Sequence, residues 1–70
     1  MNVEIVVYLD EAGDIVWDAW ERQGSSYGTD KKIGGNYIRY QTVNRALAAA
    51  RRMAKSRGWT IVLEIIAVED

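Results

Sequence analysis

Apolar and polar residues alternate over the first part of the chain in a pattern that predicts a β-hairpin. VEIVVYL (residues 3–9) is rich in β-branched residues and predicts the first strand. DEAGD suits a short hairpin turn with Gly13 as its left-handed residue, and IVWDAWE (15–21) predicts the second strand. With Asp10 opposite Asp14, one face of the hairpin carries only uncharged side chains, namely Ile5, Val7, Leu9, Ile15, Trp17 and Ala19. We expect that face to enter the core.

The rest of the chain predicts a third strand, a helix and a fourth strand. RQGSSYGTDKKIGG (22–35) predicts a flexible loop, and NYIRYQ (36–41) predicts a short strand. Thr42 suits the N-cap of a helix, VNRALAAARRMAKSR, and Gly58 suits the left-handed residue that ends it. The apolar residues of this helix form one narrow stripe: Val43, Ala46, Leu47, Ala50, Met53 and Ala54. We therefore expect a single α+β domain over residues 1–70, with a three- to four-stranded antiparallel or mixed sheet, one helix packed on one face, and the order β-β-β-α-β.

The last strand, WTIVLEIIAV (59–68), is apolar on both faces, and we expect it to lie centrally in the sheet, beside either the first or the third strand. Strict alternation places Ile61, Leu63 and Ile65 on one face and Val62 and Ile66 on the other. A single helix covers one face of a sheet, so the other is left uncovered. The uncovered face is expected to carry Val6, Tyr8, Val16, Trp20, Tyr37, Val62 and Ile66. A contiguous apolar face of this kind marks an interaction surface, so we predict that these residues bind a partner.

The three tryptophans divide between the core and this face. Trp17 and Trp59 are expected in the core, as is usual for tryptophan in a small domain. Trp20 is expected on the uncovered face and is the predicted anchor of the interface. Base stacking on Trp20, Tyr8 and Tyr37 is the rival interpretation, but the aliphatic neighbours Val6, Val16 and Ile66 suit contact with protein better.

Composition narrows the classes of function. The chain has no cysteine and no histidine, which leaves no disulfide framework, no thiolate metal site and no histidine base. The motif GSSYG (24–28) matches a nucleophile elbow in letters only, because that motif needs a histidine partner and a following helix. Asp10, Glu11 and Asp14 lack the spacing of a calcium loop and suit an ordinary turn. We expect no enzymatic activity, no metal and no cofactor.

Nothing in the chain resembles a membrane span or a signal peptide, so we expect a cytoplasmic protein without membrane contact. The net charge is only −1, but residues 1–30 are strongly acidic and residues 31–58 carry cations with no acid among them. Such a two-signed surface can orient a partner. The basic segment also opens a nucleic-acid alternative, in which phosphate is bound by Lys31, Lys32, Arg39, Arg45, Arg51, Arg52 and Lys55. The plainer interpretation of the helix cations is a solvated face whose late charges complement the helix dipole.

VVYLDEAGDIVWDAWE, then a glycine-rich segment, then YQTVNRALAAARRMAKSRG resembles the HicB-type antitoxin domain over residues 3–57. The resemblance is carried by Gly13, Thr42, Ala46, Leu47 and Ala50. It implies a protein that neutralises a small RNase toxin by binding it. Asn44 and Arg45 stand where the family often has acids, and no DNA-binding extension follows, so autorepression is not expected. In size and style only, the chain is similar to anti-CRISPR proteins, the phage-encoded inhibitors of bacterial defence.

These observations together predict a small inhibitor that docks on a larger protein, either a toxin or a bacterial defence complex, and occludes it. A homodimer through the uncovered sheet face is a further expectation. In the plainest interpretation that face merely closes an obligate dimer and function resides in the loop 22–35. A nucleic-acid-binding module using the helix 42–57 and the segment Lys31–Arg39 is the alternative from another class.

Overall fold

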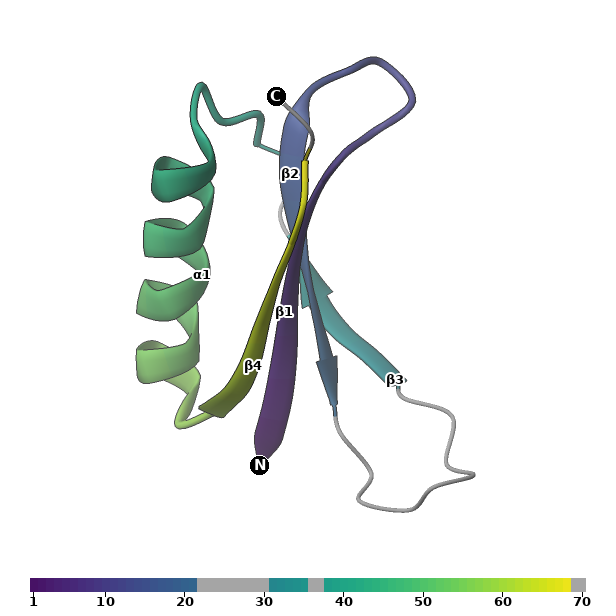
Figure 1. Ribbon diagram of the computed structural model, residues 1–70. Helices are drawn as coiled ribbons and strands as arrows, with labels where there is room; N and C mark the ends of the chain where they lie inside the picture. Colours follow the sequence, from purple (N-terminus) through teal and green to yellow (C-terminus); the bar gives the residue numbers. More distant parts are fainter. Residues whose placement is uncertain (22–30, 36–37, 69–70) are drawn as a thin grey trace.

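The computed structural model describes residues 1–21, 31–35 and 38–68, and in it four strands form one sheet with one helix against one face (Figure 1). The strands are β1 (Asn2–Leu9), β2 (Ile15–Glu21), β3 (Lys31–Gly35) and β4 (Thr60–Ala67), and the helix is α1 (Val43–Arg57). Their order across the sheet is β3-β2-β1-β4. β2 is antiparallel to β1 and β3, whereas β4 is parallel to β1. The predicted α+β class, mixed sheet and element order are confirmed.

The β1–β2 hairpin has the predicted register. Leu9 lies opposite Ile15, Val7 opposite Trp17 and Ile5 opposite Ala19. Gly13 has a φ of 83°, and the carboxylate of Asp10 accepts hydrogen bonds from the backbone N–H groups of Ala12 (3.0 Å) and Asp14 (2.9 Å). An aspartate that binds its own turn in this way, followed by a left-handed glycine, fixes the length of the loop and hence the pairing of the strands.

The core lies between the hairpin and α1. Its fully buried members are Val3, Ile5 and Val7 of β1, Trp17 and Ala19 of β2, and Ala46 and Ala50 of α1. The small alanine side chains let the helix backbone approach the sheet closely, and the large Trp17 indole fills the space between them. Trp59 is partly buried and packs against this cluster. The prediction that Trp17 and Trp59 belong to the core is confirmed.

The ends of α1 are the predicted ones. The Thr42 hydroxyl accepts a hydrogen bond from the backbone N–H of Arg45 (3.1 Å), which satisfies one of the free donors of the first turn. Gly58 has a φ of 72°, and the N–H of Trp59 donates to the carbonyl of Ala54 (2.9 Å). A left-handed glycine followed by such a bond closes the last turn and sends the chain back toward the sheet.

The position of the third strand differs from the prediction. β3 is Lys31–Gly35, inside the segment expected to be loop, and not NYIRYQ (36–41). Of the latter, Tyr40 pairs with β2 through an isolated bridge, in which its N–H donates to the carbonyl of Ile15 (3.1 Å). The two glycines that suggested a loop are required by close neighbours in the sheet. A Cβ on Gly34 would lie 3.1 Å from the Trp59 ring. The rest of the predicted loop, 22–30, lies outside the described residues.

The position of the last strand is also corrected. β4 was expected to be central, but it lies at the edge of the sheet, beside β1 only. β1 and β2 are the strands with neighbours on both sides, and the alternate residues Val3, Ile5 and Val7 of β1 are fully buried. β4 is apolar on both faces although it lies at an edge, so several of its side chains stay exposed.

Candidate docking face of the sheet

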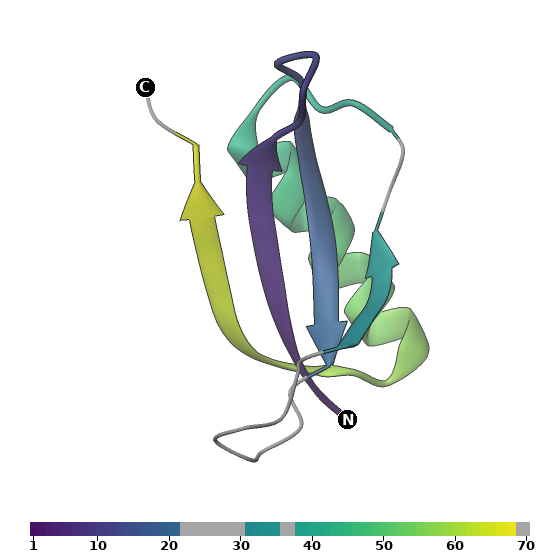
Figure 2. The same ribbon diagram turned by 90° about the vertical axis from the view of Figure 1, so that its right-hand side faces the viewer.

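Among the described residues, no helix or strand covers the face of the sheet that is turned away from α1 (Figure 2). We call it the open face. The strand registers place on it Glu4, Val6 and Tyr8 of β1, Val16, Asp18 and Trp20 of β2, Lys32 and Gly35 of β3, and Leu63, Ile65 and Ala67 of β4, with Asn2 and Thr60 at the starts of β1 and β4. They form rows across the sheet, because β1 pairs with strands on both sides. Val6, for example, lies between Asp18 and Ile65.

Four of the predicted docking residues are on the open face. Val6, Tyr8 and Trp20 lie there half-buried, and Val16 lies there almost fully buried. Tyr37 lies outside the described residues. The β4 residues that lie on the open face are not the predicted ones, because the backbone of β4 contains a bulge.

A β-bulge in β4 reverses the faces of the strand. Val3 pairs with Ile61, but the next residue, Glu4, pairs with Leu63, so Val62 is the extra residue. Beyond the bulge Glu64 and Ile66 lie opposite Ile5 and Val7, on the helix side, while Leu63 and Ile65 lie on the open face. The assignment of Ile66 to the open face is therefore wrong, and Val62 is exposed at the bulge itself.

Leu63 and Ile65 are the members of the open face that strict alternation missed. Two charges in the sequence could have indicated their position. Glu64 is the single charge within the last strand, and Arg51 flanks the apolar stripe of the helix. In the structure the Arg51 guanidinium binds both carboxylate oxygens of Glu64, each at 2.7 Å. A pairing of these two charges requires Glu64 on the helix side and hence its neighbours Leu63 and Ile65 on the other.

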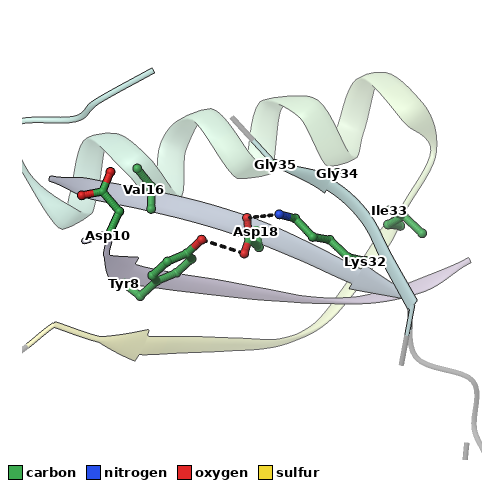
Figure 3. A pocket seen from close by; sticks show the side chains of 8 residues that line it. All are labelled: Tyr8, Asp10, Val16, Asp18, Lys32, Ile33, Gly34 and Gly35. Carbon is green, nitrogen blue, oxygen red and sulfur yellow. Dashed lines mark hydrogen bonds and ion pairs between the residues drawn. The ribbon is translucent and has the colours of Figure 1, made fainter. Parts of the chain in front are cut away.

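The middle of the open face is polar and internally satisfied. The Tyr8 hydroxyl donates to Asp18 Oδ2 (2.9 Å), and Lys32 Nζ lies 3.3 Å from Asp18 Oδ1 (Figure 3). The hydrogen bond to Asp18 raises the pKa of Tyr8 above its usual value, with burial acting in the same direction. The Asp18 side chain is only 13% exposed. Its charge is thus matched by a cation and a phenol of the same chain.

Beside Asp18 the sheet surface is hollowed by about 560 Å³. The hollow is lined by Tyr8, Asp10, Val16, Asp18, Lys32, Ile33, Gly34 and Gly35 (Figure 3). Gly35 lies opposite Asp18 in this hollow, and a Cβ on it would lie 2.8 Å from Asp18 Oδ1. The described residues hold no group of three or more acids, histidines or cysteines suited to a metal ion. The polar wall of the hollow is already partnered, because Asp18 is bound by Tyr8 and Lys32.

Apolar side chains lie around this polar centre. Leu63 and Ile65 are 41% and 39% exposed, and Trp20 lies in the row that runs through Glu4 to Leu63. The arrangement is a polar centre with an aromatic residue on one side and exposed aliphatic residues on the other. Such a mixture is common in interfaces between proteins, which have no more apolar area overall than an ordinary surface.

The described cations considered for phosphate binding lie on more than one side of the molecule. Lys32 is bound to Asp18 on the open face, and Arg51 is bound to Glu64 on the opposite side of the sheet. Arg39 pairs with Asp14 (3.3 Å), and Arg45 donates to the side-chain oxygen of Gln41 (3.2 Å). Arg52 and Lys55 are exposed on α1. The side chain of Lys31 lies outside the described part of the structure.

No family model, curated protein or solved structure matches this chain. The resemblance to HicB-type antitoxins and to anti-CRISPR inhibitors accordingly stays a prediction. In the part of the chain that the structure describes, no helix has the length and apolar character needed to span a bilayer.

Proposed function

We propose that the protein acts by binding, without catalysis, and that it docks its open face on a larger protein and blocks that protein's working surface. The observation that supports this most directly is the exposed pair Leu63 and Ile65, which continues a sheet face containing Val6 and Trp20. Side chains of this size gain about 1.5–3 kcal/mol on full burial. At roughly 40% exposure, each of the aliphatic pair has about 1 kcal/mol still to gain from a partner.

The polar centre of the open face supports the same proposal. A carboxylate without partners in the middle of a docking surface would strongly oppose desolvation. Asp18 is already paired with Lys32 and bound by Tyr8, so covering it leaves no unmatched charge. The same pairing removes Lys32 from the cations available to phosphate, which weakens the case for nucleic acid.

A partner from the toxin or bacterial-defence classes is the one that the HicB-like layout favours. Binding proteins of that kind need only a rigid surface, and this fold presents one on β1 and β2, whose pairing is fixed by the Asp10 turn. Occlusion of a site is the mechanism we propose, because it needs no catalytic group.

Capture from a bacterial lysate with matched variants tests the proposal. The immobilised wild type is compared with Trp20→Ala and Val6→Lys, which alter the open face, and with Ala48→Lys, which adds the same charge on the exposed side of α1. We expect a specific protein to be retained by the wild type and by Ala48→Lys. We expect both open-face variants to weaken its binding about tenfold or more, equivalent to about 1.4 kcal/mol.

Two results would contradict the proposal. One is retention of the same protein by both open-face variants, provided that circular dichroism shows them to be folded. The other is retention that disappears after nuclease treatment of the lysate and falls by orders of magnitude as salt rises, which is the behaviour of a phosphate-binding protein.

A further inference from the structure

The two edges of the sheet are very different. β3 forms one edge with five residues, among them two lysines and two glycines, and charge and shortness of this kind discourage further strand pairing. β4 forms the other edge with eight residues, and no described strand lies beyond it. Its exposed large side chains are Val62, Leu63, Ile65 and Ile66, at 39–47% of their full area. A long apolar edge strand of this kind is a template for pairing with another strand.

α1 covers this edge only in part. The helix crosses behind β1 and β2 and reaches β4 through Arg51, while β4 forms the margin of the sheet (Figure 2). Ile66 points to the helix side and is nevertheless 45% exposed. On the helix side β4 is covered only in part, by Ile61 packed against the core and by Arg51 bound to Glu64. Along its outer backbone no described strand pairs with it.

We propose that the outer edge of β4 pairs antiparallel with β4 of a second copy of this chain. The strand is suited to itself because its one charge is already neutralised, Glu64 being bound to Arg51 of its own chain. A two-fold axis perpendicular to the sheet brings the same residues together from both copies and needs no complementary surface elsewhere. The inference does not rest on the proposed function, since it concerns the outer backbone edge of β4, although Leu63 and Ile65 also lie on the open face.

The register follows from the side chains. Opposed residues of an antiparallel pair share a face, so an axis through the regular part of the strand passes at Glu64, Ile65 or Ile66. An axis at Glu64 would set two carboxylates opposite each other. An axis at Ile65 opposes Ile65 with its copy, Leu63 with Ala67 and Glu64 with Ile66, and it uses all of the regular segment 63–67. The dimer assigned here therefore has Ile65 on its axis.

In this dimer the two sheets become one sheet of eight strands, with both helices on one side and both open faces on the other. The interface is a short strand pair with four exposed apolar side chains from each copy, smaller than the roughly 800 Å² per partner of standard interfaces. We expect it to dissociate with a Kd on the order of 1–100 μM.

Sedimentation equilibrium from about 1 μM to about 1 mM tests the pairing around the expected Kd. The wild type should pass from monomer to dimer over that range, whereas Ile65→Lys should stay monomeric. Leu9→Lys is the matched control, because Leu9 is also an exposed apolar strand residue, at 45%, and lies on β1 away from the edge of β4. It should dimerise like the wild type.

Cross-linking tests the register directly, because the chain has no cysteine of its own. In the assigned dimer the two Cβ atoms at position 65 lie about 5 Å apart, so Ile65→Cys should form a disulfide-linked dimer under mild oxidation much faster than Leu9→Cys. Ile65→Cys also tests the strand pairing if Ile65→Lys fails to fold.

The proposal is overturned if the wild type stays monomeric throughout the range, which would leave the edge to a strand of another protein. It is overturned equally if Ile65→Lys dimerises as well as the wild type, or if the two cysteine variants cross-link at the same rate. None of these outcomes bears on the lysate experiment with Trp20 and Val6, so failure of one proposal leaves the other standing.

Discussion

Asp18 connects three strands of the open face. It lies on β2, accepts a hydrogen bond from Tyr8 of β1 and pairs with Lys32 of β3. Gly35 lies directly opposite it in the sheet and leaves it the room to do so. The largely buried carboxylate of Asp18 is thus the group around which the centre of the face is organised.

We predict that Gly35→Ala destabilises the protein by about 1–3 kcal/mol, the usual cost of overpacking. The new Cβ would lie 2.8 Å from Asp18 Oδ1 and 3.3 Å from the carbonyl oxygen of Trp17. The carboxylate would have to move and would strain its bonds to Tyr8 and Lys32. Urea unfolding monitored by tryptophan fluorescence measures the change.

A double-mutant cycle supplies the control for this prediction. In an Asp18→Ala background the nearest oxygen is gone, so the added methyl of Gly35→Ala should cost clearly less than in the wild type. Equal costs in the two backgrounds would show that the clash with Asp18 does not account for the effect.

At the scale of the elements, α1 is held to the sheet by alanines. Ala46 and Ala50 are fully buried and Ala54 is nearly so, whereas Ala48 on the outer side is exposed. The helix therefore lies close against β1 and β2, with Trp17 as the large side chain between them. The spacing of helix and sheet depends on the smallness of these residues.

Ala50→Leu is accordingly expected to lower the free energy of unfolding by about 1–3 kcal/mol, since the added carbons have no space between helix and sheet. Ala48→Leu makes the same chemical change on the solvent side and should alter stability by no more than about 0.5 kcal/mol. Urea unfolding of the pair measures both. A similar loss in the two variants would mean that packing at Ala50 is not the cause.

The elements also differ in how far sequence predicts them. The hairpin register and both ends of α1 were predicted because each depends on local chemistry, namely the Asp10–Gly13 turn, the Thr42 cap and the left-handed Gly58. β3 was misplaced because its glycines indicate a loop by propensity, while their actual role is to make room for Asp18 and Trp59. That role depends on neighbours distant in sequence.

The candidate site was predicted in part for the same reason. Tyr8, Val16 and Trp20 follow from the hairpin, whose alternation is regular. The share of β4 in the open face depends on a bulge at Val62, which alternation alone does not reveal. The edge position of β4 was missed because apolar residues on both faces are typical of a buried strand.

At the scale of the whole molecule, folding brings the two signs of charge together. The chain is acidic up to residue 30 and basic from residue 31 to residue 58. In the fold Lys32 pairs with Asp18, Arg39 with Asp14, and Arg51 with Glu64. The contrast between acidic and basic segments is therefore smaller in space than in sequence, which reduces the electrostatic steering expected from it.

The Arg51–Glu64 pair makes stability depend on pH. The hydrogen bonds from Arg51 lower the pKa of Glu64 in the folded state. Its contribution to stability is therefore present above the pKa of an unfolded glutamate, about 4.3, and is lost as the pH falls through the lower, folded value. We predict that Glu64→Gln loses less unfolding free energy than the wild type between about pH 6 and pH 3.

Urea unfolding at several pH values measures this difference. Glu11→Gln is the control, because it changes the net charge equally at an exposed turn residue and leaves the pair between α1 and β4 in place. It should retain the acid-dependent loss of the wild type. If Glu64→Gln loses as much stability in acid as the wild type does, the pair contributes nothing to the acid response.

The parallel pairing of β1 with β4 has a consequence for how the chain is made. Residues 2–9 are synthesised early, yet the neighbour that completes their hydrogen bonding comes only at residues 60–67, after 50 intervening residues, 10–59. Until then one edge of β1 in the nascent chain has no strand paired with it. Pairings between segments so distant in sequence form late in folding. A ribosome that stalls before residue 60 would leave a fragment ready to aggregate.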